Sequence, residues 1–99
     1  MSYQINYTRE AIDELRALPA RFRNRARSLI EGLVANPRPA TAKELDDHPD
    51  YYRIRLEKWR IVYLVEDDVL VVSIIGIPEK TGPETYEELG LGRSPESDS

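Results

Sequence analysis

The sequence predicts an α+β domain: a short N-terminal strand, then a two-helix hairpin, then a three-stranded antiparallel meander, all forming one mostly antiparallel sheet. Three observations lead to this prediction. Apolar and polar residues alternate over residues 3–7, and two segments of helical periodicity follow, with Pro19 between them. Residues 51–77 then contain three runs rich in β-branched and aromatic residues, separated by short charged segments, which is the pattern of a meander.

The N-terminal third supplies the first strand and both helices. Residues 3–7 are expected to join the meander as an additional strand. Thr8 is suited to cap the first helix, because its hydroxyl can accept a hydrogen bond from a free backbone N–H. A second helix is predicted over residues 20–35, with Asn36-Pro37 as its stop signal.

The meander is predicted to contain strands over residues 51–56, 59–65 and 69–77. A turn centred between Glu57 and Lys58 fixes which residues of the first two strands face each other. The opposed pairs are Leu56 with Trp59, Arg55 with Arg60, Ile54 with Ile61 and Tyr52 with Tyr63.

This register separates apolar from basic side chains, because successive side chains on a strand point to opposite faces. One face is apolar, and Arg53, Arg55 and Arg60 share the other. Like charges placed directly opposite one another destabilise a sheet. The three arginines are therefore interpreted as an anion-binding site.

Composition bounds the class of protein. A chain of 99 residues suits one domain, and its 32% of charged residues is typical of a globular protein. The absence of cysteine excludes disulfides and thiolate metal sites. No apolar run is long enough to cross a membrane and no signal peptide is recognisable, so a cytoplasmic location without membrane association is expected.

Charge is distributed unevenly along the chain, whose net charge is -4. Residues 1–63 contain 12 Lys or Arg against 9 Asp or Glu, a net charge of +3, whereas residues 64–99 contain 2 against 9, a net charge of -7. Any contact with nucleic acid is therefore expected to be local and to lie in the first two-thirds of the chain.

Residues 36–50 are predicted to form a Pro- and Asp-rich connection, with Leu45 anchored in the core. His48, the only histidine, is interpreted as an exposed loop residue in preference to a catalytic one. No phosphate-binding glycine loop, metal-ligand spacing or nucleophile elbow is present, so neither a cofactor nor a metal is expected.

Four segments and a trailing tyrosine resemble the RelE/ParE superfamily of type II toxin–antitoxin toxins. They are KEL at 43–45, PDYYRIRL at 49–56, WRIVYLV at 59–65, VLVVSIIGI at 69–77 and Tyr86. The resemblance covers residues 3–89 and implies a RelE-like domain over residues 1–89. The small and polar residues at 90–99 predict a disordered tail after it. Within the superfamily the sequence looks closer to the RelE branch than to the ParE branch.

The resemblance also implies the site. Arg53, Arg55 and Arg60 take the places of basic residues on the first two meander strands, Lys80 that of a basic residue in the C-terminal loop, and Tyr86 that of a tyrosine that orients the substrate base. The family commonly has lysines where this chain has Arg53 and Arg55, and arginine is a poor proton acceptor. Lys80, Glu44, His48 or the ribosome are the remaining candidates for proton transfer.

The implied function is that of a toxin and ribosome-dependent mRNA endonuclease (mRNA interferase) that inhibits translation through attack by the mRNA 2′-hydroxyl. The implied partners are a cognate antitoxin, the ribosome and mRNA, with DNA contacted only indirectly through the antitoxin complex. Two alternatives are a ParE-like DNA gyrase inhibitor and a catalytically weak RelE-fold protein that acts by binding its antitoxin. A stand-alone RNA-binding domain is disfavoured by the acidic C-terminal third.

Overall fold

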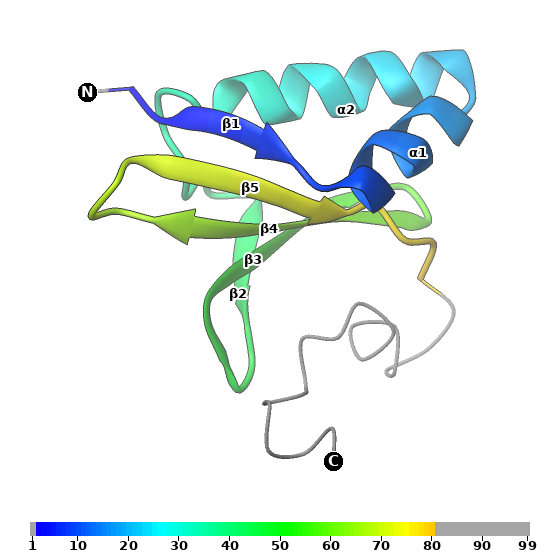
Figure 1. Ribbon diagram of the computed structural model, residues 1–99. Helices are drawn as coiled ribbons and strands as arrows, with labels where there is room; N and C mark the ends of the chain where they lie inside the picture. Colours follow the sequence, from blue (N-terminus) through cyan, green and yellow to red (C-terminus); the bar gives the residue numbers. More distant parts are fainter. Residues whose placement is uncertain (1, 81–99) are drawn as a thin grey trace.

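The computed structural model describes residues 2–80, in which two helices lie on one face of a five-stranded sheet (Figure 1). In chain order the elements are β1 (Gln4–Tyr7), α1 (Arg9–Ala17), α2 (Ala20–Gly32), β2 (Ala42–Leu45), β3 (His48–Leu56), β4 (Trp59–Glu66) and β5 (Val71–Gly76). The strand order is β1-β5-β4-β3-β2, with β1 parallel to β5 and every other pair antiparallel. The predicted α+β class and mostly antiparallel sheet are confirmed.

The helices begin where the sequence predicted, but the second is shorter. The Thr8 hydroxyl accepts a hydrogen bond from the Ala11 N–H at 3.1 Å and so caps α1. Pro19 is the N-cap of α2, which ends at Gly32 and not at residue 35. The predicted end was wrong because Leu33 is buried as the C-cap residue, so its apolar contact continues although the helix does not.

The meander has the predicted register. Arg55 lies opposite Arg60, and the three other predicted pairs of β3 and β4 are also found. The turn at Glu57 makes this possible with a left-handed backbone, φ 55°. A bulge between Val62 and Tyr63 affects only the pairing of β4 with β5.

Residues 36–50 are not only a connection, and this part of the prediction was wrong. They contain β2, which pairs with β3, and the start of β3 at His48. The predicted burial of Leu45 is confirmed at 7% exposure. His48 is half-buried at the first position of β3, with its ring edge-on to Tyr51 at 6.4 Å between centroids, and is not an exposed loop residue.

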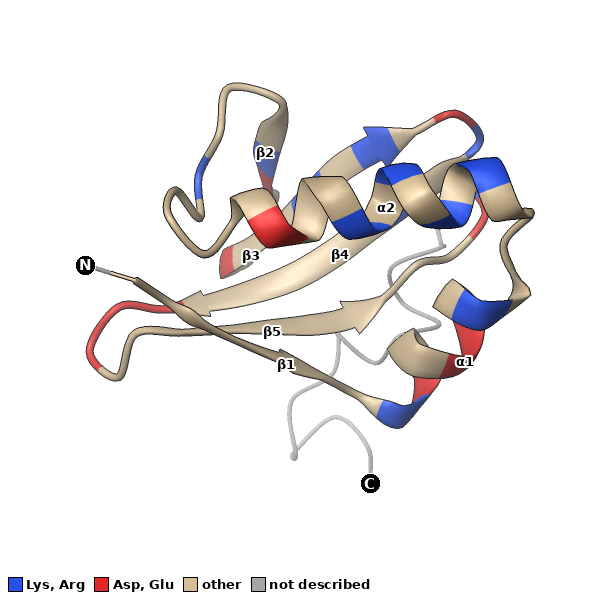
Figure 2. Ribbon diagram, turned by 90° about the horizontal axis from the view of Figure 1, so that it is seen from above, with Lys and Arg blue, Asp and Glu red and all other residues tan. Residues whose placement is uncertain are grey.

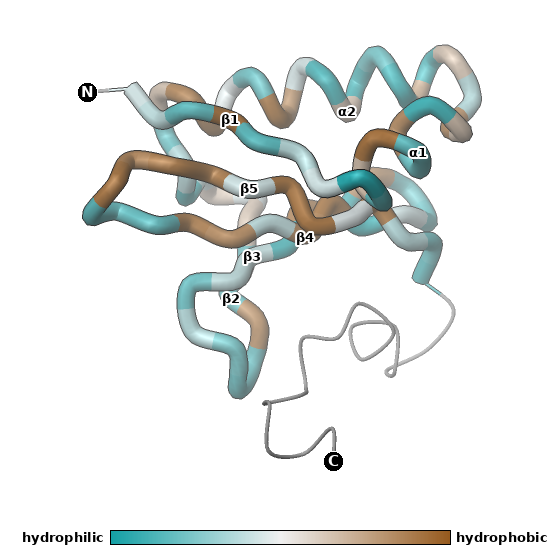
Figure 3. The backbone as a smooth tube through the Cα atoms, in the orientation of Figure 1, coloured by the Kyte–Doolittle hydropathy of each residue, from teal (hydrophilic) through white to brown (hydrophobic). Residues whose placement is uncertain are grey.

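The core lies between the helices and the sheet, where the tube in Figure 3 is most hydrophobic along β4 and β5. Its buried members are Ala11, Leu15, Leu18, Ala26, Ile30, Leu33, Ile54, Leu56, Ile61, Tyr63, Val65, Val72, Ile74 and Ile77. Between residues 2 and 80, no helix has the length and apolar character needed to cross a membrane. The helices therefore cover one face of the sheet and form the core with it.

Candidate functional site

The predicted arginines lie on the sheet face opposite the helices. Ile54, Leu56 and Ile61 pack into the core under the helices, so the residues that alternate with them point the other way. Arg53, Arg55 and Arg60 are those residues. Within residues 2–80 no helix covers this face (Figure 1).

The three arginines differ in how firmly they are held. Arg60 is only 6% exposed. Its Nη1 donates hydrogen bonds to the backbone carbonyls of Trp59 at 3.0 Å and Glu57 at 3.3 Å, so its charge is fixed beside the β3–β4 turn. Arg55, directly opposite, is exposed, and Arg53 is half-buried. The pair therefore combines one anchored and one adaptable guanidinium group.

Lys43 belongs to the same face, and the sequence prediction missed it. In the β2–β3 register Lys43 lies directly opposite Arg53, so both side chains project from one face. Together Lys43, Arg53, Arg55 and Arg60 are called the cationic face. The sequence AKEL could have revealed this position. Once residues 42–45 are recognised as a strand, side-chain alternation puts Lys43 on the same face as Arg53.

Within residues 2–80, no hydrogen bond or ion pair neutralises the side chains of Lys43, Arg53 or Arg55. Two like-charged cross-strand pairs thus lie side by side, Lys43 with Arg53 and Arg55 with Arg60. Such pairs are destabilising unless an anion is shared between them. Guanidinium groups match the geometry of phosphate oxygens, so the cationic face is suited to bind a phosphodiester.

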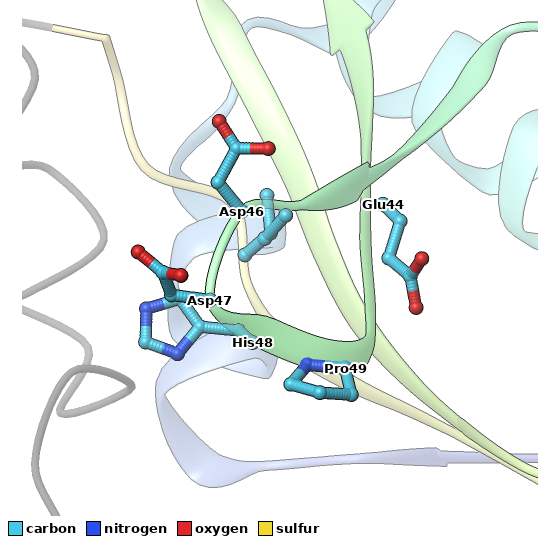
Figure 4. Close-up of a pocket in the computed structure, with 6 residues that line it drawn as sticks. Glu44, Asp46, Asp47, His48 and Pro49 are labelled. Carbon is cyan, nitrogen blue, oxygen red and sulfur yellow. The ribbon is translucent and has the colours of Figure 1, made fainter.

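Glu44 and His48 belong to the β2–β3 hairpin and lie apart from the arginine rows. Glu44 pairs with Tyr52 and projects from the opposite face, where its Oε2 accepts a hydrogen bond from the Asp50 N–H at 2.9 Å. His48 lies beside Asp47 at the tip of the β2–β3 hairpin, on the far side from Glu44 (Figure 4). Their geometry favours a structural role in the hairpin.

Lys80 lies close to the anchored arginine. The Arg60 N–H donates to the Pro78 carbonyl at 2.9 Å, and the Lys80 N–H donates to the Lys58 carbonyl at 2.7 Å. These backbone bonds lie on the side of β4 that faces β5, away from β3. Tyr86 and the predicted tail lie outside the described residues, and the role of Tyr86 stays a prediction.

A second arginine cluster occupies the other end of the sheet. Arg38, Asp67, Tyr3 and Tyr52 are called the Arg38 cluster. The Arg38 guanidinium forms a bidentate pair with Asp67, with Nη1–Oδ1 at 3.1 Å and Nη2–Oδ2 at 2.7 Å. Its Nε donates to the Tyr52 hydroxyl at 2.8 Å, and the Tyr3 hydroxyl donates to Asp67 at 2.6 Å. The cluster joins β1 and β3 to the acidic β4–β5 turn, which is red in Figure 2.

The Arg38 cluster also shifts the titration of its members. Hydrogen bonds from Arg38 and Tyr3 lower the pKa of Asp67, because they stabilise the carboxylate. The same bond to Asp67 raises the pKa of Tyr3.

Next to the cluster, Tyr63 is fully buried, stacks on Tyr52 and donates to the Pro37 carbonyl at 2.8 Å. Burial raises the pKa of Tyr63.

Known proteins are similar to this chain in sequence and in fold. Residues 5–79 match the family model described as ParE toxin of type II toxin-antitoxin system, parDE. The mRNA interferase toxin RelE of Escherichia coli is 30% identical over 90 residues, covering 89% of this chain and 94% of that protein. The putative toxin RelE1 of Methanocaldococcus jannaschii is 28% identical over 85 residues, covering 83% and 94%.

Solved structures of RelE toxins are similar to this chain in fold. A mutant of the E. coli toxin RelE in the free state superposes with a TM-score of 0.77 at 28% identity, covering 91% of this chain and 96% of that chain. The toxin in the intact E. coli RelBE toxin-antitoxin complex gives a TM-score of 0.72 at 28% identity, covering 82% and 100%. In the part of this chain that the structure describes, no group of three or more acidic or histidine side chains could hold a metal ion. By its sequence and by its fold, the chain belongs to the toxins of type II toxin–antitoxin systems, in the RelE/ParE superfamily.

Proposed function

We propose that this toxin is a ribosome-dependent mRNA endonuclease that stops translation by cutting mRNA. The observation that carries the proposal is the cationic face, which places at least three cations without partners among residues 2–80 on the sheet face opposite the helices. The 30% identity to a protein named mRNA interferase supports it, since that protein is matched over 94% of its length.

The proposed reaction uses the mRNA's own 2′-hydroxyl as the nucleophile. Attack on the neighbouring phosphate creates a pentavalent phosphorane that carries extra negative charge. Arg53, Arg55 and Arg60 stabilise this charge, because preorganised cations aimed at developing charge contribute several kcal/mol. Arg60, already fixed by two backbone carbonyls, needs little reorganisation to do so. Lys80 adds a further cation from beside β4, and Tyr86 is proposed to orient a base by stacking.

The proposed partners follow from this activity. A toxin similar to this chain is known in a toxin-antitoxin complex, and we expect a cognate antitoxin to hold this toxin inactive. The ribosome and mRNA are the proposed targets, and with them we propose a cytoplasmic location for the toxin. Contact with DNA is expected only through the antitoxin complex.

The test is a purified translation system in which the 5′ ends of mRNA fragments are mapped with and without ribosomes. We expect cuts in the A-site codon that require ribosomes and that disappear in Arg55→Ala. Arg9→Ala is the matched control, because Arg9 is also an exposed arginine but begins α1 in the helical layer. Absence of cuts with folded wild-type toxin, or equal cutting by Arg55→Ala, would contradict the proposal.

A second candidate is inhibition of DNA gyrase, favoured by the match of residues 5–79 to a ParE family model. The two functions produce different first effects in cells. A gyrase poison induces the DNA damage response before protein synthesis falls, whereas an mRNA endonuclease stops protein synthesis first. Pulse labelling of protein, together with a DNA damage reporter, after induction of the toxin distinguishes them.

A further inference from the structure

We propose that Lys43 is the proton acceptor of the cleavage reaction and takes the proton from the attacking 2′-hydroxyl. This inference rests on the proposed endonuclease function and adds a catalytic residue to it. It answers a chemical problem that the arginines create.

The problem is that the cationic face consists mainly of guanidinium groups. Arginine stays protonated under all physiological conditions, with a pKa above about 12, so Arg53, Arg55 and Arg60 stabilise charge but accept no proton. A lysine amine releases its proton more readily than a guanidinium group, with an ordinary pKa of about 10.4, and serves as a general base in enzymes in its deprotonated form. Among residues 2–80, Lys43, Lys58 and Lys80 are the only lysines.

The strand register selects Lys43 from these three. It lies directly opposite Arg53, on the neighbouring strand about 4.8 Å away. The Arg55–Arg60 pair is the next row on the same face, two residues or about 7 Å along β3. A phosphate held between these rows lies within reach of the flexible four-carbon stem of Lys43.

The other titratable candidates are placed less well. Glu44, one residue along β2, projects from the opposite face and is engaged with the Asp50 backbone. His48 lies at the hairpin tip, five residues from Arg53. The Lys80 backbone pairs on the β5 side of β4, so β3 and β4 lie between it and Lys43. Lys58 Nζ pairs with Glu79 at 3.4 Å.

The proposed cleavage is an in-line displacement, in which the attacking and leaving oxygens lie on opposite sides of phosphorus. The 2′-hydroxyl transfers its proton to the neutral Lys43 amine while the O2′–P bond forms. The P–O5′ bond then breaks, and O5′ takes a proton from water. The products are a 2′,3′-cyclic phosphate and a 5′-hydroxyl, and Lys43 returns its proton to solvent.

The first test compares Lys43→Arg with wild type in the purified translation system, by single-turnover cleavage as a function of pH. Lys43→Arg keeps the positive charge but removes the proton acceptor, so we expect a loss of about 100-fold or more and a flattened rise of rate with pH. Lys58→Arg is the matched control and is expected to retain wild-type cleavage. Circular dichroism melting confirms that each variant is folded.

A second variant uses the absence of cysteine in the chain. Lys43→Cys offers a single thiol, which alkylation with 2-bromoethylamine converts into a less basic analogue of lysine. If Lys43 accepts the proton, alkylation restores cleavage and moves the pH–rate profile to lower pH. A purely electrostatic role predicts restored cleavage with an unmoved profile.

The outcomes separate this proposal from the proposed function. Wild-type cleavage with an equally active Lys43→Arg, or with an unmoved profile after alkylation, overturns the role of Lys43 and leaves the endonuclease intact. No cleavage by folded wild-type toxin overturns both. Loss of cleavage in Lys43→Arg together with a shifted profile in the alkylated variant establishes Lys43 as the acceptor.

Discussion

The cationic face and the Arg38 cluster show two different uses of arginine in one sheet. Arg38 is fully engaged, with two hydrogen bonds to Asp67, one to Tyr52 and its guanidinium carbon 5.4 Å from the Tyr52 ring centroid. Arg55 lies opposite another arginine and has no partner within residues 2–80. The chain contains more acids than bases, so a partner for Arg55 was available. Arg38 thus stabilises the fold, and the exposed position of Arg55 agrees with the proposal that it binds mRNA.

The largest expected effect comes from replacing each of the two arginines with alanine and comparing cleavage and stability. Arg55→Ala removes charge from the cationic face, and we expect mRNA cleavage to fall about 100-fold or more, as for loss of one transition-state donor. Its melting temperature should stay the same or rise, because a like-charged cross-strand pair is relieved. Arg38→Ala should show the reverse, with retained cleavage and a lower melting temperature. Retained cleavage in Arg55→Ala would remove the distinction between the two sites.

Arg60 is expected to contribute both to the stability of the fold and to cleavage. Arg60→Ala removes the buried donor that satisfies the carbonyls of Glu57 and Trp59. We expect a loss of about 1–3 kcal/mol in the free energy of unfolding, measured by urea denaturation, in addition to lost cleavage. Arg60→Lys serves as the comparison, since it retains charge without the planar fork. Unchanged stability in Arg60→Ala would mean that the anchoring bonds contribute nothing to the fold.

Because of Tyr63, which lies beside the Arg38 cluster, we expect the stability of the folded protein to fall at alkaline pH. Its raised pKa means that the folded state resists ionisation, while the unfolded chain ionises near the ordinary value of 10.0. The stability that Tyr63 contributes is therefore present below about pH 10 and is lost as pH rises further. Tyr63→Phe should cost about 1 kcal/mol at neutral pH through the lost bond to Pro37, and should lose less stability above pH 10 than wild type. Parallel melting curves across this range would contradict the prediction.

Asp67 gives the smallest expected effect, because the pair is exposed. Its lowered pKa means that the stabilisation is present above the ordinary value of 3.8 and is lost as pH falls through the lower, folded-state value. Asp67→Asn should therefore melt below wild type at neutral pH, and this difference should disappear in acid. Asp68→Asn, at the neighbouring exposed position of the same turn, is the control and should match wild type throughout.

The sequence was sufficient for the β3–β4 register, because alternation and a two-residue turn leave little freedom there. Both Arg55 opposite Arg60 and the face they share followed from it. β2 was not predictable from pattern, since Ala42–Leu45 has one buried apolar residue and is specified by its pairing with β3. Lys43 was missed with β2, because its position depends on that pairing.

The contacts of the Arg38 cluster could not be predicted from the sequence, for a different reason. Arg38 and Asp67 lie in two loops separated by 29 residues, and nothing in either loop specifies the other. Tyr3 joins them from a position 64 residues before Asp67. Contacts of this kind depend on where the sheet places the ends of its strands, which only the assembled fold determines.

The parallel pairing of β1 with β5 has a consequence for synthesis of the toxin. Gln4 pairs with Val71, and α1 is tied to β5 through the Thr8 hydroxyl, which donates to the Ile75 carbonyl at 2.7 Å. A nascent chain that has made β1 must therefore wait for about 67 further residues, or roughly 3–13 seconds at bacterial elongation rates, before that strand finds its neighbour. The hairpin of β3 and β4 needs only local contacts and can form earlier. The N-terminal strand and first helix therefore cannot complete their contacts with β5 until nearly the whole of residues 2–80 has left the ribosome.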